Sequence, residues 1–257
     1  MISPYEIHLW FAFDEQITDA QLLDRYHNLM NEAEGKQQKR FHFKKHRHQY
    51  LITRALVRSV LSFYVDEISP QEWQFNLNKF GKPSIQQPDV HLPLQFNLSH
   101  TEQMAVALNS EVGVDIEYLH RRGKTLELAE SYFSPSEVEQ LLDLPKKHQR
   151  QRFFELWTLK EAYIKACGMG LSIPLNQFSY VFPQKGNIRI SFASERDDQP
   201  EKWQFWHICP DDSHRVSVAL KRDAPDVIYV LSMRKVLPLA EIQELDYPIL
   251  MKSAALS

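Results

Sequence analysis

The sequence predicts an α+β fold built from two similar halves in one chain, and three observations point to it. Residues 47–64 and 152–167 have the pattern of long helices, and shorter runs with strand character lie before and after them. The third observation is an internal echo. Ser99-His100 leads into Met-Ala-Val-Ala-Leu108, and Ser213-His214 leads into Val-Ser-Val-Ala-Leu220. The echo suggests that the two halves meet near residue 110.

The first half is expected to open with a strand over residues 5–13 and a helix over 18–33. In the segment 47–64, apolar residues recur every three or four positions and arginines occupy the opposite side. This is the pattern of an amphipathic helix packed on a core. The loop that follows contains the turn Phe80-Gly-Lys-Pro83. Two more strands are expected at 96–98 and 104–108.

The second half is expected to begin with a strand over 112–117. Ser134-Pro-Ser-Glu137 has the capping serine, early proline and back-bonding glutamate of a helix start. Gly168 and Gly170 end the helix over 152–167. Later strands are expected at 179–182, 188–192, 203–208, 216–220 and 227–232. The predicted division is an N-terminal half, a C-terminal half and a peripheral tail, over residues 1–110, 111–237 and 238–257.

Composition excludes several classes of protein. The net charge of −3 argues against nucleic-acid binding by bulk electrostatics. No apolar run approaches the ~20 residues that a membrane span needs, and the first residues lack the pattern of a signal peptide. Cys167 and Cys209 are the only cysteines, so neither a disulfide framework nor a cysteine metal site is expected. We therefore expect a cytoplasmic protein that contacts no membrane.

Two carboxylates, Asp115 and Glu117, stand one residue apart in the predicted strand 112–117. Residues i and i+2 of a strand project from the same face, so the two charges repel and need a compensating charge or open water. One interpretation is an edge strand that carries exposed acids. The alternating apolar residues Val112, Val114 and Ile116 favour the other, in which the acids line a cleft.

A third carboxylate, Glu161, lies four residues before Lys165 in the predicted helix 152–167. The pair could be a surface ion pair worth only ~0.3–0.5 kcal/mol. The helix is strongly apolar, however, which favours charged residues that face a site. Three carboxylates with water and phosphate would suit Mg²⁺, and Mn²⁺ is possible, whereas no histidine–cysteine set favours zinc. Arg47, Arg54 and Lys82 are candidate phosphate contacts, although the arginines could equally form a solvated helix face.

Taken together, four segments resemble the 4′-phosphopantetheinyl transferases, specifically the larger monomeric group of the surfactin-synthetase-activating type. The likeness runs in order from about residue 30 to about residue 180, and it includes Gly170-Leu-Ser-Ile-Pro174. The segments are Phe80-Gly-Lys-Pro83, Asn97-Leu-Ser-His100, Gly113-Val-Asp-Ile-Glu117 and Trp157-Thr-Leu-Lys-Glu-Ala-Tyr-Ile-Lys165.

The resemblance implies two α+β halves related by a pseudo-twofold, with coenzyme A and Mg²⁺ bound in the cleft between them. On this mapping Asp115, Glu117 and Glu161 hold the cation, which bridges the pyrophosphate of coenzyme A. Lys165 reaches the phosphate that leaves with adenosine. A serine of an apo acyl or peptidyl carrier protein attacks the pantetheine-side phosphorus, 3′,5′-ADP leaves, and Glu161 is the best general base, directly or through a water.

The remaining contacts to coenzyme A are also implied by the resemblance. Ser99 and His100 would contact the nucleotide end or the pyrophosphate, and His100 joins Glu161 and Lys165 as an expected catalytic residue. Lys82 would lie along the adenine and its 3′-phosphate. Arg47 and Arg54 would be further phosphate partners. The basic residues within 36–45 are left unassigned because their register departs from that of the relatives.

The basic segment 118–124 could dock the acidic helix of a carrier protein, or it could be a solvated loop. Two other functions share part of the pattern. A metal-dependent hydrolase of a nucleotide pyrophosphate would use water in place of a carrier serine. A module without catalytic activity that only binds coenzyme A or a carrier protein would need no complete metal site. We expect a monomer, because one chain would supply both sides of the cleft.

Overall fold

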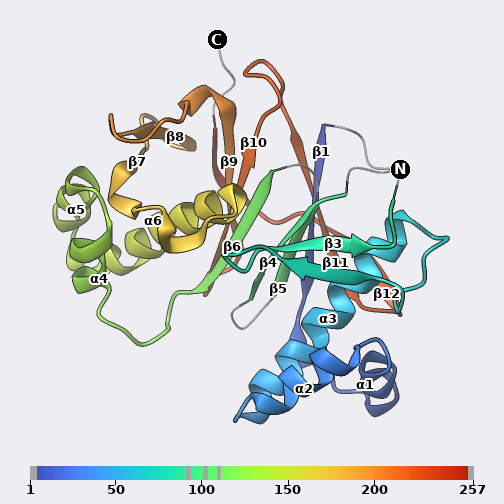
Figure 1. Ribbon diagram of the computed structural model, residues 1–257. Helices are drawn as coiled ribbons and strands as arrows, with labels where there is room; N and C mark the ends of the chain where they lie inside the picture. The colour runs from blue at the N-terminus through green and yellow to red at the C-terminus, as the bar shows by residue number, and fades with distance from the viewer. Residues whose placement is uncertain (1–4, 91–93, 101–103, 109–110, 254–257) are drawn as a thin grey trace.

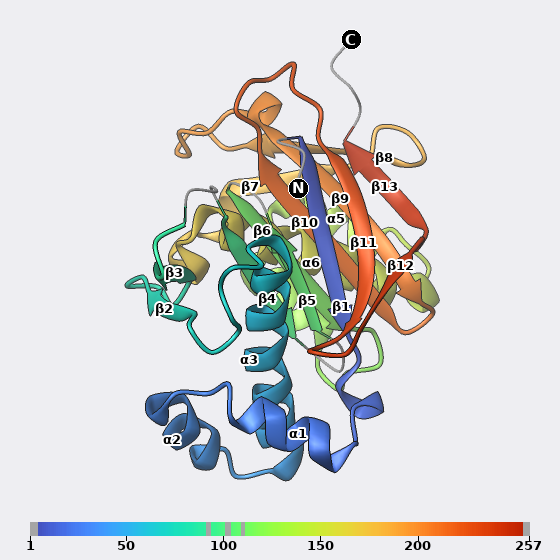
Figure 2. The same cartoon turned by 90° about the vertical axis from the view of Figure 1, so that its right-hand side faces the viewer.

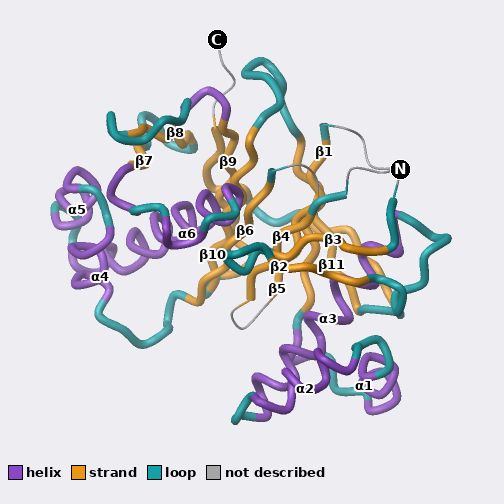
Figure 3. The backbone as a smooth tube through the Cα atoms, viewed as in Figure 1, coloured by secondary structure: helices purple, strands orange, loops and turns teal. Residues whose placement is uncertain are grey.

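The computed structural model describes residues 5–90, 94–100, 104–108 and 111–253, and it shows two β-sheets with helices on either side (Figures 1 and 3). One sheet has five strands in the order β12-β11-β1-β5-β4, and the other has six in the order β6-β10-β9-β13-β8-β7. A separate hairpin is formed by β2 and β3. The predicted α+β class is therefore confirmed. No helix of the described part of the chain is both long and apolar enough to pass through a membrane.

In the described part of the first half, three α-helices pack mainly on one another and on β1. The predicted helix 18–33 is too long, because α1 ends at His27 and a second cap starts another helix that runs to Arg40. Asp19 caps the first helix, and Asn31 forms a capping box with Glu34 at the start of the second. The elements are β1 (Glu6–Ala12), α1 (Ala20–His27), α2 (Glu32–Arg40), α3 (Lys44–Tyr64), β2 (Gln74–Leu77), β3 (Pro83–Gln87), β4 (Phe96–His100) and β5 (Met104–Leu108).

In the second half, α4, α5 and α6 gather on one side of the six-stranded sheet (Figure 1). The expected long helix begins six residues earlier than predicted and ends at Gly168, which adopts the left-handed conformation of a helix end. The elements are β6 (Val112–Tyr118), α4 (Thr125–Tyr132), α5 (Pro135–Leu142), α6 (Lys146–Cys167), β7 (Phe178–Val181), β8 (Asn187–Phe192), β9 (Trp203–Asp211) and β10 (His214–Lys221).

Residues 238–253, the described part of the segment expected to be a peripheral tail, instead supply one strand to each sheet, and β11 before them belongs to the expected second half. The last three strands are β11 (Val230–Leu237), β12 (Glu241–Leu245) and β13 (Ile249–Ser253). β11 runs parallel to β1 and β12 pairs with β11, while β13 lies between β9 and β8 (Figure 2). Because each of these strands fills a place in a hydrogen-bonded ladder, the sheets would be incomplete without them. The boundary near residue 110 stays a prediction.

The two sheets meet where edge strand β4 lies beside edge strand β6, and polar side chains bridge them. The backbone N–H of Val114 donates to Oδ1 of Asn97 at 2.9 Å. The backbone N–H of Ile116 donates to Oγ of Ser99 at 3.3 Å. Side chains of β4 thus satisfy backbone donors of β6, which fixes the register of the two halves.

Helix α6 lies directly on β6, and Gly113 is the reason that it can. A Cβ built on Gly113 would stand 2.0 Å from the carbonyl oxygen of Ala162 and 2.3 Å from the amide nitrogen of Ala166. On the neighbouring strand, Ser217 donates to Thr158 of α6 at 2.9 Å. The close approach brings the carboxylates of β6 under the charged residues of α6.

Replacing Gly113 with alanine is therefore expected to lower the free energy of unfolding by at least about 2 kcal/mol, because the helix backbone must move away from β6. Urea unfolding of purified protein measures the change. Gly35 is the matched control, since nothing lies within 4 Å of its virtual Cβ. Gly35→Ala in helix α2 should raise the free energy of unfolding by no more than about 1 kcal/mol. Equal stability of Gly113→Ala and the wild type would contradict the close helix–strand contact.

Candidate active site

Ser99, Asp115 and Lys165 form a bonded cluster where β4, β6 and α6 converge. Nζ of Lys165 lies 2.6 Å from Oδ1 of Asp115 and 3.0 Å from Oγ of Ser99. Ser99 in turn donates to the same Asp115 oxygen at 3.0 Å and accepts from the N–H of Ile116. The hydroxyl of Ser99 therefore uses its one donor and both lone pairs. Three elements distant in sequence are tied together around one carboxylate.

The second oxygen of Asp115 has no such partner. Oδ2 is buried and has no hydrogen bond among the residues that the structure describes. A buried carboxylate oxygen without a donor is costly, so a hydrogen-bond donor or a cation is expected to bind there.

Glu117 and Glu161 lie close enough to Asp115 to feel its charge. Burial raises the pKa of Glu117 to about 7, and the charge of Asp115 adds to the rise. Burial raises the pKa of Glu161 to about 7 as well, again with a contribution from Asp115. Lys165 and Arg121 oppose both shifts, and Nη1 of Arg121 lies 3.2 Å from Oε1 of Glu117. The cluster is thus short of positive charge at neutral pH.

The chemistry of these donors fits a hard divalent cation, but the side chains are not gathered into a coordination shell. Among the described residues, no three histidine, cysteine, aspartate or glutamate side chains are grouped so that they could hold a metal ion. The ammonium of Lys165 is bonded to one oxygen of Asp115, and Arg121 forms an ion pair with Glu117. The three carboxylates, with one buried oxygen free of hydrogen bonds, nevertheless supply only the oxygen ligands that Mg²⁺ and Mn²⁺ take.

Lys82 lies at the other end of the helix–strand contact, in the turn between β2 and β3. Its Nζ donates to the carbonyl of Ala166 at 2.9 Å and to that of Val112 at 3.4 Å. Lys82 also lines a cavity of about 740 Å³ whose wall includes Glu111 and Cys167. None of the three carboxylates of the cluster belongs to the wall of that cavity as the described residues define it.

The other predicted phosphate contacts have partners of their own. Arg54 lies over the ring of Tyr50 and 3.8 Å from Glu34. Nε of Arg47 donates to the carbonyl of Phe41 at 2.7 Å. The structure thus does not bring the two arginines into the cluster around Asp115. The side chain of His100 lies outside the described part of the structure.

Comparison with known proteins decides the family. Residues 111–222 match the model of the 4′-phosphopantetheinyl transferase superfamily, and residues 18–112 match that of the N-terminal region of 4′-phosphopantetheinyl transferase. The 4′-phosphopantetheinyl transferase HetI of Nostoc sp. is 31% identical over 218 residues, which cover 84% of this chain and 87% of the relative. The chain belongs to the 4′-phosphopantetheinyl transferase family. It is accordingly an enzyme of this class.

Further relatives place the transferase in the larger, Sfp-type group, as the sequence motifs predict. The 4′-phosphopantetheinyl transferase Sfp of Bacillus subtilis is 34% identical over 170 residues, which cover 65% of this chain and 73% of that protein. A putative 4′-phosphopantetheinyl transferase of Synechocystis sp. is 30% identical over 184 residues, covering 70% of this chain and 73% of the relative.

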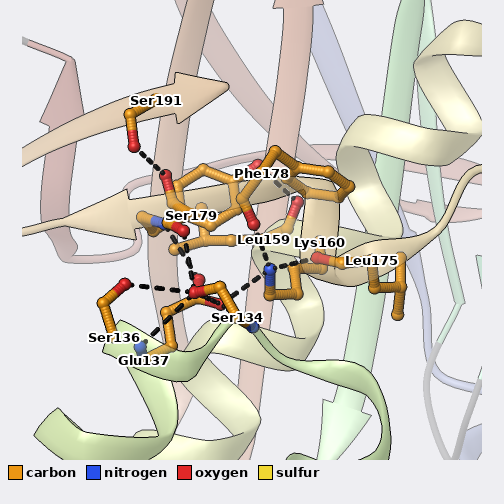
Figure 4. Close-up of polar contacts among 10 residues, drawn as sticks. Ser134, Ser136, Glu137, Leu159, Lys160, Leu175, Phe178, Ser179 and Ser191 are labelled. Atoms are coloured by element: carbon orange, nitrogen blue, oxygen red, sulfur yellow. Dashed lines mark hydrogen bonds and ion pairs between the residues drawn. The ribbon is translucent and has the colours of Figure 1, made fainter. Parts of the chain in front are cut away.

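Sequence reasoning missed two residues of the transferase that lie beside the site. From the sequence alone, Glu137 is explained by its place in a helix cap, and nothing assigns Lys160, the neighbour of Glu161, a role. In the structure they form an ion pair with both side chains fully buried (Figure 4). The available signal was Lys160 itself, a charged residue within an apolar stretch of α6.

Proposed function

We propose that this transferase moves the 4′-phosphopantetheine group from coenzyme A to a serine of an apo acyl or peptidyl carrier protein, with Mg²⁺ or Mn²⁺, and releases 3′,5′-ADP. The observation that carries the proposal is the cluster around Asp115. It combines a lysine ammonium with three carboxylates, one of which has a buried oxygen without a hydrogen bond. This arrangement suits a reaction at a charged diphosphate, in which positioning and electrostatics do most of the work.

Asp115, Glu117 and Glu161 would hold the cation, which supplies charge neutralisation at the diphosphate when bound. Glu161 takes the proton from the serine hydroxyl, directly or through a water. The serine oxygen forms a bond to the pantetheine-side phosphorus, and the bond from that phosphorus to the oxygen of 3′,5′-ADP breaks. Lys165 donates to the phosphate that leaves.

The nucleotide end of coenzyme A is proposed to lie against the first half of the chain, residues 1–110. Ser99 holds Asp115 and Lys165 in place from that side. Lys82 lies beside the 740 Å³ cavity and would contact the adenine and its 3′-phosphate. His100, Arg47 and Arg54 are proposed as further phosphate contacts. The second half, from residue 111, supplies the metal ligands and the catalytic helix.

The loop after β6 is proposed to dock the carrier protein. Arg150 of α6 holds this loop, since its Nε donates to the carbonyl of Leu119 at 2.7 Å and its Nη2 to the carbonyl of Arg121. Arg122 and Lys124 are exposed within this loop. A preformed basic loop next to the metal strand complements an acidic helix beside the carrier serine.

Charge reversal of Arg122 is expected to raise the KM for the carrier protein by about tenfold and to leave the KM for coenzyme A unchanged, because a rim charge acts mainly on association with its partner. Arg121 is left intact because it contacts Glu117. Initial rates with each substrate varied in turn measure both constants. Lys185→Glu, an exposed change of equal charge between β7 and β8, is the control. A normal carrier KM for Arg122→Glu would remove this loop from the docking surface.

The reaction itself is tested by incubating the enzyme with coenzyme A, Mg²⁺ and an apo carrier protein, and then measuring the mass of the carrier. A gain of one phosphopantetheine group with release of 3′,5′-ADP supports the proposal. Cleavage of coenzyme A without modification would make the enzyme a hydrolase, and neither event would make it a binding module. We further propose a cytoplasmic monomer, which two free cysteines and a site built from one chain support.

A further inference from the structure

A buried ion pair lies in the core of the second half, behind the proposed site. Nζ of Lys160 lies 2.8 Å from Oε2 of Glu137, and both side chains have 0% of their surface exposed. Figure 4 shows the two residues between helix α5, helix α6 and the chain leading into β7. The pair touches none of the groups that the proposed reaction uses, yet Lys160 directly precedes Glu161.

Both charges are fully bonded, and almost every partner lies outside α6. Besides Glu137, Lys160 donates to the carbonyls of Leu175 and Phe178, each at 2.7 Å, so its three hydrogens all have acceptors. Oε1 of Glu137 accepts from the N–H of Tyr180 at 2.9 Å, and Oε2 accepts from the N–H and the hydroxyl of Ser134. One ammonium thus joins α6 to α5 and to the chain around β7.

Stability alone is a weak reason to keep such a pair. Moving two charges out of water costs about as much as their attraction returns, and apolar residues of similar volume often serve equally well. In some proteins a buried polar or charged group selects one arrangement of the packed elements, because a displaced charge would lose its partners.

Helix α6 carries Glu161 and Lys165, so its rotation decides where both side chains lie. Ala162 and Ala166 lie against the backbone of β6 at Gly113, and Ser217 of β10 donates to Thr158. The ion pair of Lys160 adds a third attachment, to α5 and the chain around β7. Successive residues of a helix point about 100° apart, so the direction of Lys160 sets the direction of Glu161. The same rotation sets Lys165, which must meet Asp115.

We propose that Glu137 and Lys160 are positioning residues, which fix the rotation and axial register of α6 and thereby aim Glu161 and Lys165 at the strand carboxylates. This inference rests on the proposed function for its catalytic consequence. The structural part of the inference concerns the arrangement of the carboxylates proposed to bind the metal. It can be tested by metal binding alone, without coenzyme A or a carrier protein.

The test is the double variant Lys160→Met/Glu137→Gln, which removes both charges and keeps an acceptor for Tyr180. Mn²⁺ binding to the full-length protein is measured by electron paramagnetic resonance, and folding by circular dichroism and urea unfolding. We expect a folded protein whose dissociation constant for Mn²⁺ rises by about tenfold or more, as for the loss of residues that orient metal ligands. In the transfer assay kcat falls while the KM for the carrier stays unchanged.

Two further variants keep the proposal open to refutation. Glu137→Gln alone is the milder change if the double variant does not fold, and it should weaken Mn²⁺ binding in the same direction. Ile188→Ala removes core volume from the same half at a buried site in β8, and should lower stability without changing Mn²⁺ affinity.

Wild-type Mn²⁺ affinity in a folded double variant or in Glu137→Gln would overturn the positioning role, as would an equal loss of affinity in Ile188→Ala. A different pair of results would separate the two proposals. If the wild type binds Mn²⁺ but modifies no carrier, and the variant has lost Mn²⁺ binding, the proposed function is refuted and the positioning role stands.

Discussion

Asp115→Asn is expected to lower kcat for transfer by about a thousandfold, since an amide keeps the shape and the hydrogen bonds but removes the charge at the centre of the site. Ser99 and Lys165 both converge on Oδ1 of Asp115. The neutral side chain still accepts from them, so the fold should survive. Rates of carrier modification at saturating coenzyme A, with unfolding curves of the same preparations, measure the two effects separately.

The matched control for this substitution is Asp19→Asn, which retains the cap of α1 far from the cluster. It should leave kcat unchanged. An Asp115→Asn variant that transfers at the wild-type rate would eliminate Asp115 as a metal ligand, and with it the central element of the proposed mechanism.

Glu161→Gln is expected to lower kcat by about a hundredfold or more and, in metal-free protein, to raise stability above neutral pH. The pKa of Glu161 is about 7 in the folded state, against an ordinary value of 4.5 for a solvated glutamate. Between these values the folded chain holds a proton that the unfolded chain has released. Wild-type stability therefore falls as pH rises through this window, by on the order of 1–3 kcal/mol for this group.

Urea unfolding at a series of pH values from 4 to about 8, in the presence of a chelator, measures this slope. Because other groups titrate in the same range, the informative quantity is the difference between wild type and variant. That difference should grow from near zero below the lower pKa to its full size above the upper one. Added Mg²⁺ should raise the stability of the wild type more than that of the variant. Parallel curves would show that Glu161 titrates normally.

Local features of the fold could be predicted from the sequence because they depend on neighbouring residues. The stripe in α3 and the capping box at Ser134 act over a few positions, and both were predicted where they occur. The cap at Asn31 is not evident from the pattern of apolar residues, so the predicted helix 18–33 runs past the end of α1 and most of α2 is not predicted. Pairing between distant strands has no such local signal. No pattern in the residues near Val230 predicts that it pairs with Glu6.

The candidate site divides in the same way. Motifs supplied the residue types, and the structure joins three of them, Ser99, Asp115 and Lys165, by direct hydrogen bonds. Spacing could not reveal that Lys165 takes one oxygen of Asp115, or that Arg121 pairs with Glu117. The partner of Lys160 was equally hidden, since Glu137 lies on another helix and its role as a cap already accounted for it.

The parallel pairing of β1 with β11 has a consequence for folding of the chain during its synthesis on the ribosome. β1 emerges first, and its inner residues, Ile7, Leu9 and Phe11, are fully buried only in the finished molecule. One edge can be covered early by β5, but the other waits until residues 230–237 have been synthesised. During that interval the nascent chain presents an apolar, unpaired strand edge, the feature through which chains associate wrongly. Truncation before β11 makes that exposure permanent.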